Sequence, residues 1–349
     1  MFNLRLLALC CVISAAILSG ISMSCSRAVF AEKDNRQVVR DIAGPYSFNY
    51  ASWEFQALVS SVKGTFSGNN GKSDKENILR GQVKEILAES KIQGFPPLNF
   101  SLEQPPYLLV ISPRNEIIYL DRVVLSQQLT VDDAERIEKQ VDELDLSSLV
   151  VSLGGFGGTY PPIVDDNAGY KYTINIVVEE WLHQYLAFKP LGFRYLLDSI
   201  GIQQHRDVAV MNETLAGIVS KELGSAVYEH YYKDKETIVE KDKPDFDFDA
   251  EMRETRKQVD LFLSQGHIEE AERYMNDRKE VFQEHGYNIR KLNQAYFAFH
   301  GIYGHDPASV SPINEDLKQL RAKSITLKDF LDKTSSMTSY NDLKQALRD

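Results

Sequence analysis

Three side chains in the segment VVEEWLHQYL, residues 177–186, have types and a spacing suited to metal-dependent hydrolysis. Glu179 and His183 are four residues apart, and on an α-helix such residues point the same way with Cβ atoms about 5–6 Å apart. They could therefore bind one metal ion. Glu180 is turned about 100° around the axis, where its carboxylate could reach a metal-bound water as a base. This is the logic of the His-Glu-x-x-His motif, with glutamate in the first ligand position.

A third ligand is available later in the chain. Glu213 lies in MNETLAGIVSKEL, directly after Asn212, on a second expected helix. Carboxylate oxygen is an accepted zinc ligand, although two carboxylates shift the preference toward manganese or iron and acidify the bound water less. Three acids around one point repel one another unless a cation or protonation offsets them. Because both segments are otherwise apolar, these acids need partners.

Two other interpretations of the motif stay open. The helix could belong to a scaffold that holds no metal, or Glu-Glu-x-x-His could occur by chance on a solvated helix. Further along, residues 289–304 predict a helix with a polar stripe that includes His300 and Tyr303. Either side chain could stabilise an oxyanion formed when water attacks a carbonyl. The alternative for this stripe is an ordinary, mostly buried amphipathic helix.

Over residues 150–305, EEWLHQYL and NETLAGIVSKE resemble the gluzincin metallopeptidases, especially predicted bacterial aminopeptidase-like proteins with HEWxH and NEtxA patterns. The resemblance implies that Glu180 is the general base, and that His183 and Glu213 are zinc ligands. It also implies a metallopeptidase-like fold and a peptide or protein substrate. It does not extend to Glu179, because the family has histidine there.

The N-terminal segment predicts export. Arg5 precedes an apolar run, followed by small residues and a polar stretch, as in a signal peptide. Cleavage after Ala31, an uncleaved anchor and lipid attachment at Cys25 all remain open. The expected location is extracytoplasmic, secreted or membrane-anchored, with any membrane association through this segment. Without residues 1–31, which carry two arginines, the formal charge changes from −11 to −13. Such acidity, without a basic cluster, argues against nucleic acid as a partner.

The elements that must position the site predict an α+β protein. A helix is expected over 77–90, with apolar Ile78 among its core residues. Residues 105–126 predict a β-hairpin, 130–144 a helix capped by Thr130, and 147–153 a buried strand. The glycine-rich LGGFGGTYPP, which lacks the lysine and helix of a phosphate loop, predicts an irregular sheet edge. From Tyr170 onward the periodicity is helical.

The chain is accordingly expected to be mainly helical, with a small sheet in its N-terminal half. We divide it into the leader or anchor (1–31), an N-terminal α+β region with the hairpin (32–150), a metallopeptidase-like core (151–243) and a C-terminal helical region packing on that core (244–349). The function expected is an exported, metal-dependent hydrolase, with zinc as the first choice of ion. The alternative is an inactive scaffold that binds a peptide or protein partner at the cell envelope.

Overall fold

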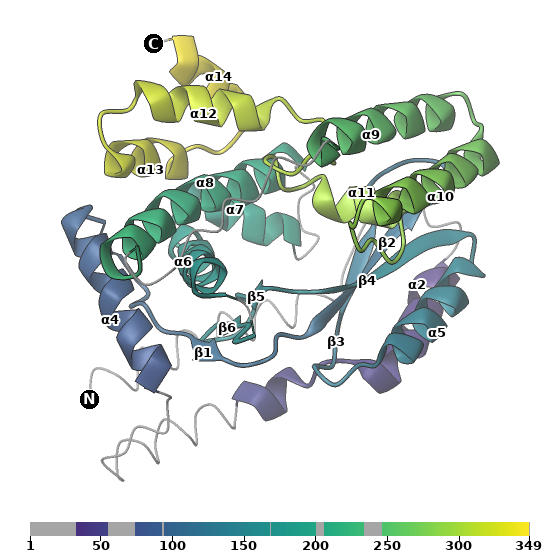
Figure 1. Ribbon diagram of the computed structural model, residues 1–349, viewed down its shortest axis with the longest axis horizontal. Coiled ribbons are helices and arrows are strands. Elements are labelled where there is room, and N and C mark those ends of the chain that lie inside the picture. Colours follow the sequence, from purple (N-terminus) through teal and green to yellow (C-terminus); the bar gives the residue numbers. More distant parts are fainter. Residues whose placement is uncertain are drawn as a thin grey trace.

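The computed structural model describes residues 33–54, 74–92, 94–167, 169–199, 206–233 and 246–348. Its helices and short strands make the protein α+β and mainly helical, as predicted (Figure 1). All described strands lie between Ser101 and Val164, in the first half of the chain. The proposed leader, residues 1–31, lies outside the described residues. In the described ranges we find no helix with the length and apolar character needed to span a membrane.

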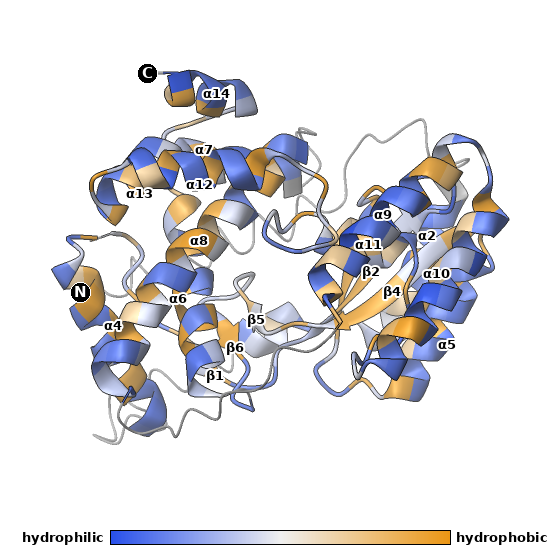
Figure 2. Cartoon of the chain, turned by 45° about the horizontal axis from the view of Figure 1, so that its top comes forward, coloured by the Kyte–Doolittle hydropathy of each residue, from blue (hydrophilic) through white to orange (hydrophobic). Residues whose placement is uncertain are grey.

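The larger sheet is three-stranded, in the order β3-β2-β4, and antiparallel throughout. Its strands are β2 (Tyr107–Pro113), β3 (Asp121–Leu125) and β4 (Leu146–Ser152). The hairpin β2–β3 and the strand β4 confirm the sequence prediction, although β3 begins later than expected. Figure 2 shows β2 and β4 as largely hydrophobic, which is typical of strands covered on both faces.

Alternate residues of β2 belong to two different hydrophobic cores, because successive side chains of a strand point to opposite faces of the sheet. Leu109 and Ile111 face α2 (Lys33–Ala43) and α5 (Val131–Asp142). Leu108 and Val110 face α11 (Gln294–His300). The predicted cap at Thr130 is confirmed, and it forms a reciprocal capping box with Asp133. A short 3₁₀ helix, η2 (Gly44–Tyr46), follows α2.

The second sheet is smaller and lies beside the helical half (Figure 1). Its strand order is β1-β6-β5, with β1 (Ser101–Leu102) parallel and β5 (Gly155–Phe156) antiparallel to the central β6 (Ile163–Val164). The glycine-rich segment therefore includes an edge strand, as predicted. Residues 154–158 are called the glycine segment below.

The largest core surrounds two adjacent helices, α6 (Tyr170–Leu186) and α8 (Arg206–Tyr231). The helices α4 (Asp74–Glu89) and α7 (Pro190–Ser199) pack against them. The prediction for Ile78 is wrong: it is 55% exposed, whereas its neighbour Leu79 is buried. Leu79 shares the buried face with Val83, Ile86 and Leu87, whereas Ile78 points about 100° away from Leu79 and lies outside that face.

The region 244–349 packs on both halves of the molecule. Its last three helices lie against α8 and belong to the largest core: α12 (Ile313–Lys323), α13 (Leu327–Ser335) and α14 (Tyr340–Arg348). Before them, α9 (Phe248–Ser264) and α10 (Ile268–Glu284) form the predicted helical hairpin. Gly266 makes the turn at a positive φ of 77°, which glycine adopts without strain. This hairpin forms a separate core with Phe297 and Ala298 of α11.

Candidate metal centre

The helix α6 carries its candidate site residues on the side that the core does not cover. Its buried face includes Val177, Val178 and Trp181, and the Trp181 indole donates a 2.9 Å hydrogen bond to the carbonyl of Pro96. This bond fixes the helix against the chain that precedes β1. Glu179, Glu180 and His183 are half-buried and stand on the remaining side.

The helix α8 places three consecutive buried polar residues against α6. Asn212, Glu213 and Thr214 are each at most 5% exposed, in a helix that is otherwise apolar at this level. Thr214 is used to fix the chain that follows α11, because its hydroxyl accepts a 3.1 Å hydrogen bond from the amide of Gly304. Asn212 and Glu213 are left to face His183.

Glu179, His183 and Glu213 form a cluster, called the acid–histidine cluster below. Each residue offers one ligand atom, and the three atoms lie within 4.8 Å of one another. His183 Nε2 lies 3.4 Å from Glu213 Oε2. Two donors on a tetrahedral ion with bonds of about 2.0–2.1 Å are separated by about 3.3 Å. The donor types and this spacing fit one divalent cation.

Neighbouring polar groups orient both partners of that pair. His183 Nδ1 lies 3.0 Å from Asn212 Oδ1, and Tyr195 of α7 donates a 2.6 Å hydrogen bond to Glu213 Oε1. An imidazole that donates through Nδ1 keeps the lone pair of Nε2 for a ligand. In the same way, the Tyr195 bond occupies one oxygen of Glu213 and leaves the other facing His183.

Burial and the charges of the cluster itself shift the pKa values of its members. Burial, the largest influence, raises the pKa of Glu179 to about 7 and that of Glu180 to about 8. Desolvation opposes the charge on His183, but nearby carboxylates, with Glu213 foremost, raise its pKa to about 10. Burial also opposes the charge on Glu213, yet His183 and Arg122 lower its pKa. The metal-free cluster therefore holds protons that a dication would displace.

Glu180 does not belong to the cluster but lies against the glycine segment. The amide of Gly157 donates a hydrogen bond to its carboxylate. A Cβ built on Gly155 would lie 2.3 Å from Glu180 Oε1, and one on Gly157 would lie 2.7 Å from Oε2. Such distances are shorter than any real contact, so a larger residue at either position would displace the carboxylate. Glycine is required here for the close approach of a side chain.

The structure separates the two candidates on the polar stripe around α11. The Tyr303 hydroxyl group is desolvated, and the nearby carboxylates of Glu213 and Glu179 add to this effect, so its pKa is raised well above 10. It is therefore a neutral O–H donor beside the cluster. His300 instead bonds through Nδ1 to Asp306 at 2.9 Å and packs on Tyr296.

The helix that carries these residues is shorter than predicted, because α11 covers only 294–300 of the expected 289–304. Asn293 caps it by accepting a hydrogen bond from the amide of Tyr296. Tyr303 and Gly304 therefore lie in the turns that follow, and not on a helical stripe with His300.

Several residues at the site carry no signal in the sequence. Tyr195 follows His183 on another helix, and Arg122 comes from β3, far earlier in the chain. Asn212 belongs to the NEtxA-type segment, but the sequence predicts no role for it. Tyr195 and Arg122 belong to no motif, since both are brought to the site by tertiary packing.

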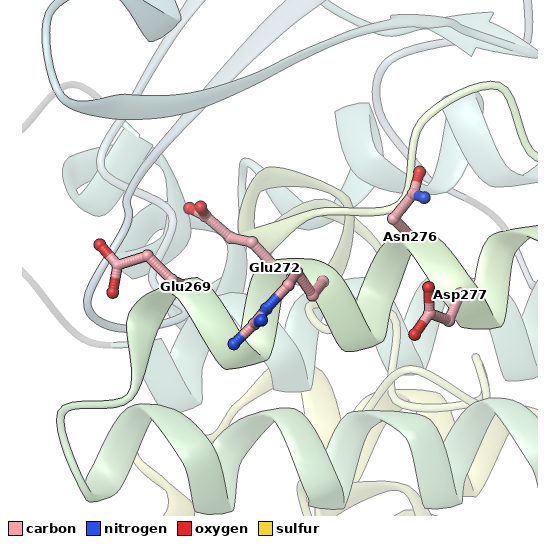
Figure 3. Close-up of a pocket in the computed structure, with 5 residues that line it drawn as sticks. Glu269, Glu272, Asn276 and Asp277 are labelled. Atoms are coloured by element: carbon pink, nitrogen blue, oxygen red, sulfur yellow. The ribbon is translucent and has the colours of Figure 1, made fainter.

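A surface hollow of about 730 Å³ lies elsewhere, on the outer face of α10 (Figure 3). It is lined by Glu269, Glu272, Arg273, Asn276 and Asp277. Glu272 is already held by Arg114, which donates to it at 2.7 and 2.8 Å. The hollow is thus the exposed side of a structural ion pair.

Comparison with known proteins provides no relative of this chain: no protein-family model, no curated protein and no solved structure matches it. The site must be interpreted from its own geometry.

Proposed function

We propose that the protein is an exported, metal-dependent hydrolase of the peptidase type, related in design to the gluzincins. Glu179, His183 and Glu213 would hold one divalent ion, with zinc as the first choice. The observation that supports this proposal is the convergence of three ligand atoms from α6 and α8 within 4.8 Å. The expected metallopeptidase-like fold is part of the same proposal.

The donor set bears on the identity of the ion. One imidazole and two carboxylates suit zinc, and the two oxygen donors also suit manganese or iron. A bound ion of this kind would polarise a carbonyl and acidify an attacking water, although less than a site with two histidines and one carboxylate.

The residues around the ion would then divide the proton transfers between them. Glu180, held by the amide of Gly157, takes the proton of the attacking water and passes it to the leaving amine. A cation at the cluster would lower the raised pKa of Glu180 toward neutral pH, where a base works best. Tyr303 keeps its proton and could donate to the carbonyl oxygen as negative charge develops there.

The substrate class and the location come from the sequence. The resemblance to gluzincins favours a peptide or protein substrate, and the N-terminal segment favours an extracytoplasmic site of action, secreted or membrane-anchored. The acidic composition makes nucleic acid an unfavourable partner.

One observation favours an inactive scaffold as the second candidate. The charges at the site can be balanced without metal. Glu179 and Glu180 have raised pKa values, which favour their neutral forms, and His183 pairs with Glu213. A metal-free protein with this core could still bind a peptide or protein at the cell envelope.

Metal analysis decides between the two. The full chain, purified without added metal and then titrated with zinc, should bind about one equivalent, and Glu213→Ala should abolish the binding. Glu229→Ala, an exposed position on the same helix, is the matched control and should bind normally. Glu180→Gln should keep the ion and lose peptide hydrolysis. A wild-type chain that takes up no metal would exclude the hydrolase, and hydrolysis by Glu180→Gln would exclude this base.

A further inference from the structure

Arg122 brings a positive charge from the larger sheet to the acidic site. It lies on β3, opposite Val110 of β2, and the residue is solvent-exposed. Its side chain hydrogen-bonds to the phenol of Tyr119. Its charge acts on Glu213 of the acid–histidine cluster and on Tyr195, the residue that donates to Glu213.

The surroundings of Arg122 connect it to the glycine segment as well. Its charge acts on Tyr50, whose ring lies 6.0 Å from that of Phe156 in β5. The neighbouring Gly155 and Gly157 contact Glu180, the proposed base. Arg122 is therefore placed among phenol groups that link the metal ligands on one side and the base on the other.

The pairing of Arg122 differs from that of other arginines. Three arginines hold a glutamate with two guanidinium nitrogens: Arg114 with Glu272, Arg290 with Glu138 and Arg321 with Glu222. Within the described ranges, Arg122 has no such carboxylate partner, and its hydrogen-bonding neighbour is a phenol. A guanidinium presents five N–H donors in a planar fork that matches a carboxylate. Donors of Arg122 are thus left that no carboxylate in the described part of the chain occupies.

We propose that Arg122 binds a carboxylate of the substrate, so that the protein selects peptides or related amides with a carboxylate near the cleaved bond. This inference rests on the proposed function for its site and adds the substrate class. The carboxylate could be the C-terminal group of a peptide or an acidic side chain, since both present the same fork of oxygens.

A purely structural role for Arg122 is the competing explanation. Its charge could serve only to offset the three glutamates of the site. In that case its loss would affect every substrate equally, because the defect would lie in the cluster. An anchor for the substrate predicts a defect confined to substrates that carry the carboxylate. The two explanations therefore differ in specificity.

Binding is measured first, on metal-loaded Glu180→Gln, so that the result does not depend on catalysis. The probes are tetrapeptide pairs that differ in one group: a free C-terminus against a carboxamide, and glutamate against glutamine. The carboxylate member of at least one pair should bind tighter by roughly tenfold to a hundredfold, the range of a charge-assisted hydrogen-bonded pair. Adding Arg122→Gln should remove this preference, and the pair that shows it identifies the source of the carboxylate.

Hydrolysis by the full chain provides the second measurement. Arg122→Gln should lower kcat/KM for the carboxylate substrate by a similar factor and leave its neutral partner almost unchanged. Arg122→Lys should fall between, because it keeps the charge without the fork. Arg273→Gln, the same change on the exposed face of α10, is the control.

Three results would overturn the assignment. The first is that Glu180→Gln with Arg122 intact binds both members of every peptide pair equally. The others are that Arg122→Gln loses the same factor of kcat/KM on both substrates, or that Arg122→Gln loses the metal. If no peptide is hydrolysed but the carboxylate preference in binding is present and depends on Arg122, the hydrolase proposal fails while the anchor stands.

Discussion

Asn212 Oδ1 lies 3.0 Å from His183 Nδ1, and Asn212 is the chain neighbour of Glu213. One turn of α8 therefore supplies both a proposed ligand and the group that orients another proposed ligand. Asn212→Ala should weaken zinc binding by about 10–100-fold, the usual effect of losing such a partner. Competition with a chelator of known affinity measures this. Asn212→Asp, which keeps an acceptor, should retain most of the affinity, and an unchanged affinity in Asn212→Ala would show that the contact does not matter.

The glycine segment provides a test of the position of the base. Gly155→Ala would place a Cβ 2.3 Å from Glu180 Oε1, so the carboxylate must move. We expect kcat to fall by about 100-fold, as for a misplacement of about 1 Å, with the metal content unchanged. Gly169→Ala, with open space around its Cβ, is the control. Full activity in Gly155→Ala would mean that Glu180 is not the base or is not held here.

Tyr303 and His300 differ in their expected contributions. Tyr303→Phe removes a neutral donor beside the cluster and should lower kcat by about 100- to 1,000-fold without loss of metal. His300→Gln should change kcat only slightly, because His300 is engaged with Asp306. Steady-state kinetics of both variants measures the difference. A larger loss in His300→Gln than in Tyr303→Phe would reverse this assignment.

Metal binding should depend on pH. In the metal-free fold the pKa of Glu179 is raised from 4.5 to about 7, so between these values the folded state keeps a proton that the unfolded chain has lost. The stability of the metal-free fold should therefore fall as pH rises through this window. His183, with its raised pKa, must also lose its proton to bind an ion. Zinc should consequently raise Tm more at about pH 8 than at about pH 5.5. A shift that is equal at both values would contradict the ligand set.

Glu138 tests the stability of the larger sheet. It is 3% exposed, accepts two hydrogen bonds from Arg290 at 2.5 and 2.9 Å, and accepts the amide of Val150 at 2.6 Å. Glu138→Ala would leave these donors unpaired. Because Arg290 is partly exposed, we expect a loss of about 2–3 kcal/mol in the free energy of unfolding, below the value for a fully buried pair. Lys318→Ala, at an exposed ion pair, should cost less than about 1 kcal/mol in the same denaturant titration.

Local features of the fold could be predicted because their signals are local. The strand β2 follows from a continuous apolar run, and α5 from its capping residue. The end of α11 and the exposure of Ile78 could not be predicted in this way. They depend on which face meets a neighbouring element, and this is decided by packing between distant segments.

The candidate site likewise combines residues with a local sequence signal and residues placed only by tertiary packing. The spacing of Glu179, Glu180 and His183 follows from helix geometry, and Glu213 could be proposed from its setting in an apolar segment. Arg122, Tyr119 and Tyr195 could not be found, because no spacing rule connects a strand residue with two helices that follow much later.

The hydrogen bond from the Gly304 amide to Thr214 connects a distant turn to the proposed ion site. A Cβ at residue 304 would lie 2.4 Å from Thr214 Oγ1, next to a ligand, so almost any replacement would push on that residue. Substitutions of Gly304 would then change the affinity for the ion while every ligand atom is preserved. A catalogue of functional positions drawn only from groups that touch the ion would overlook them.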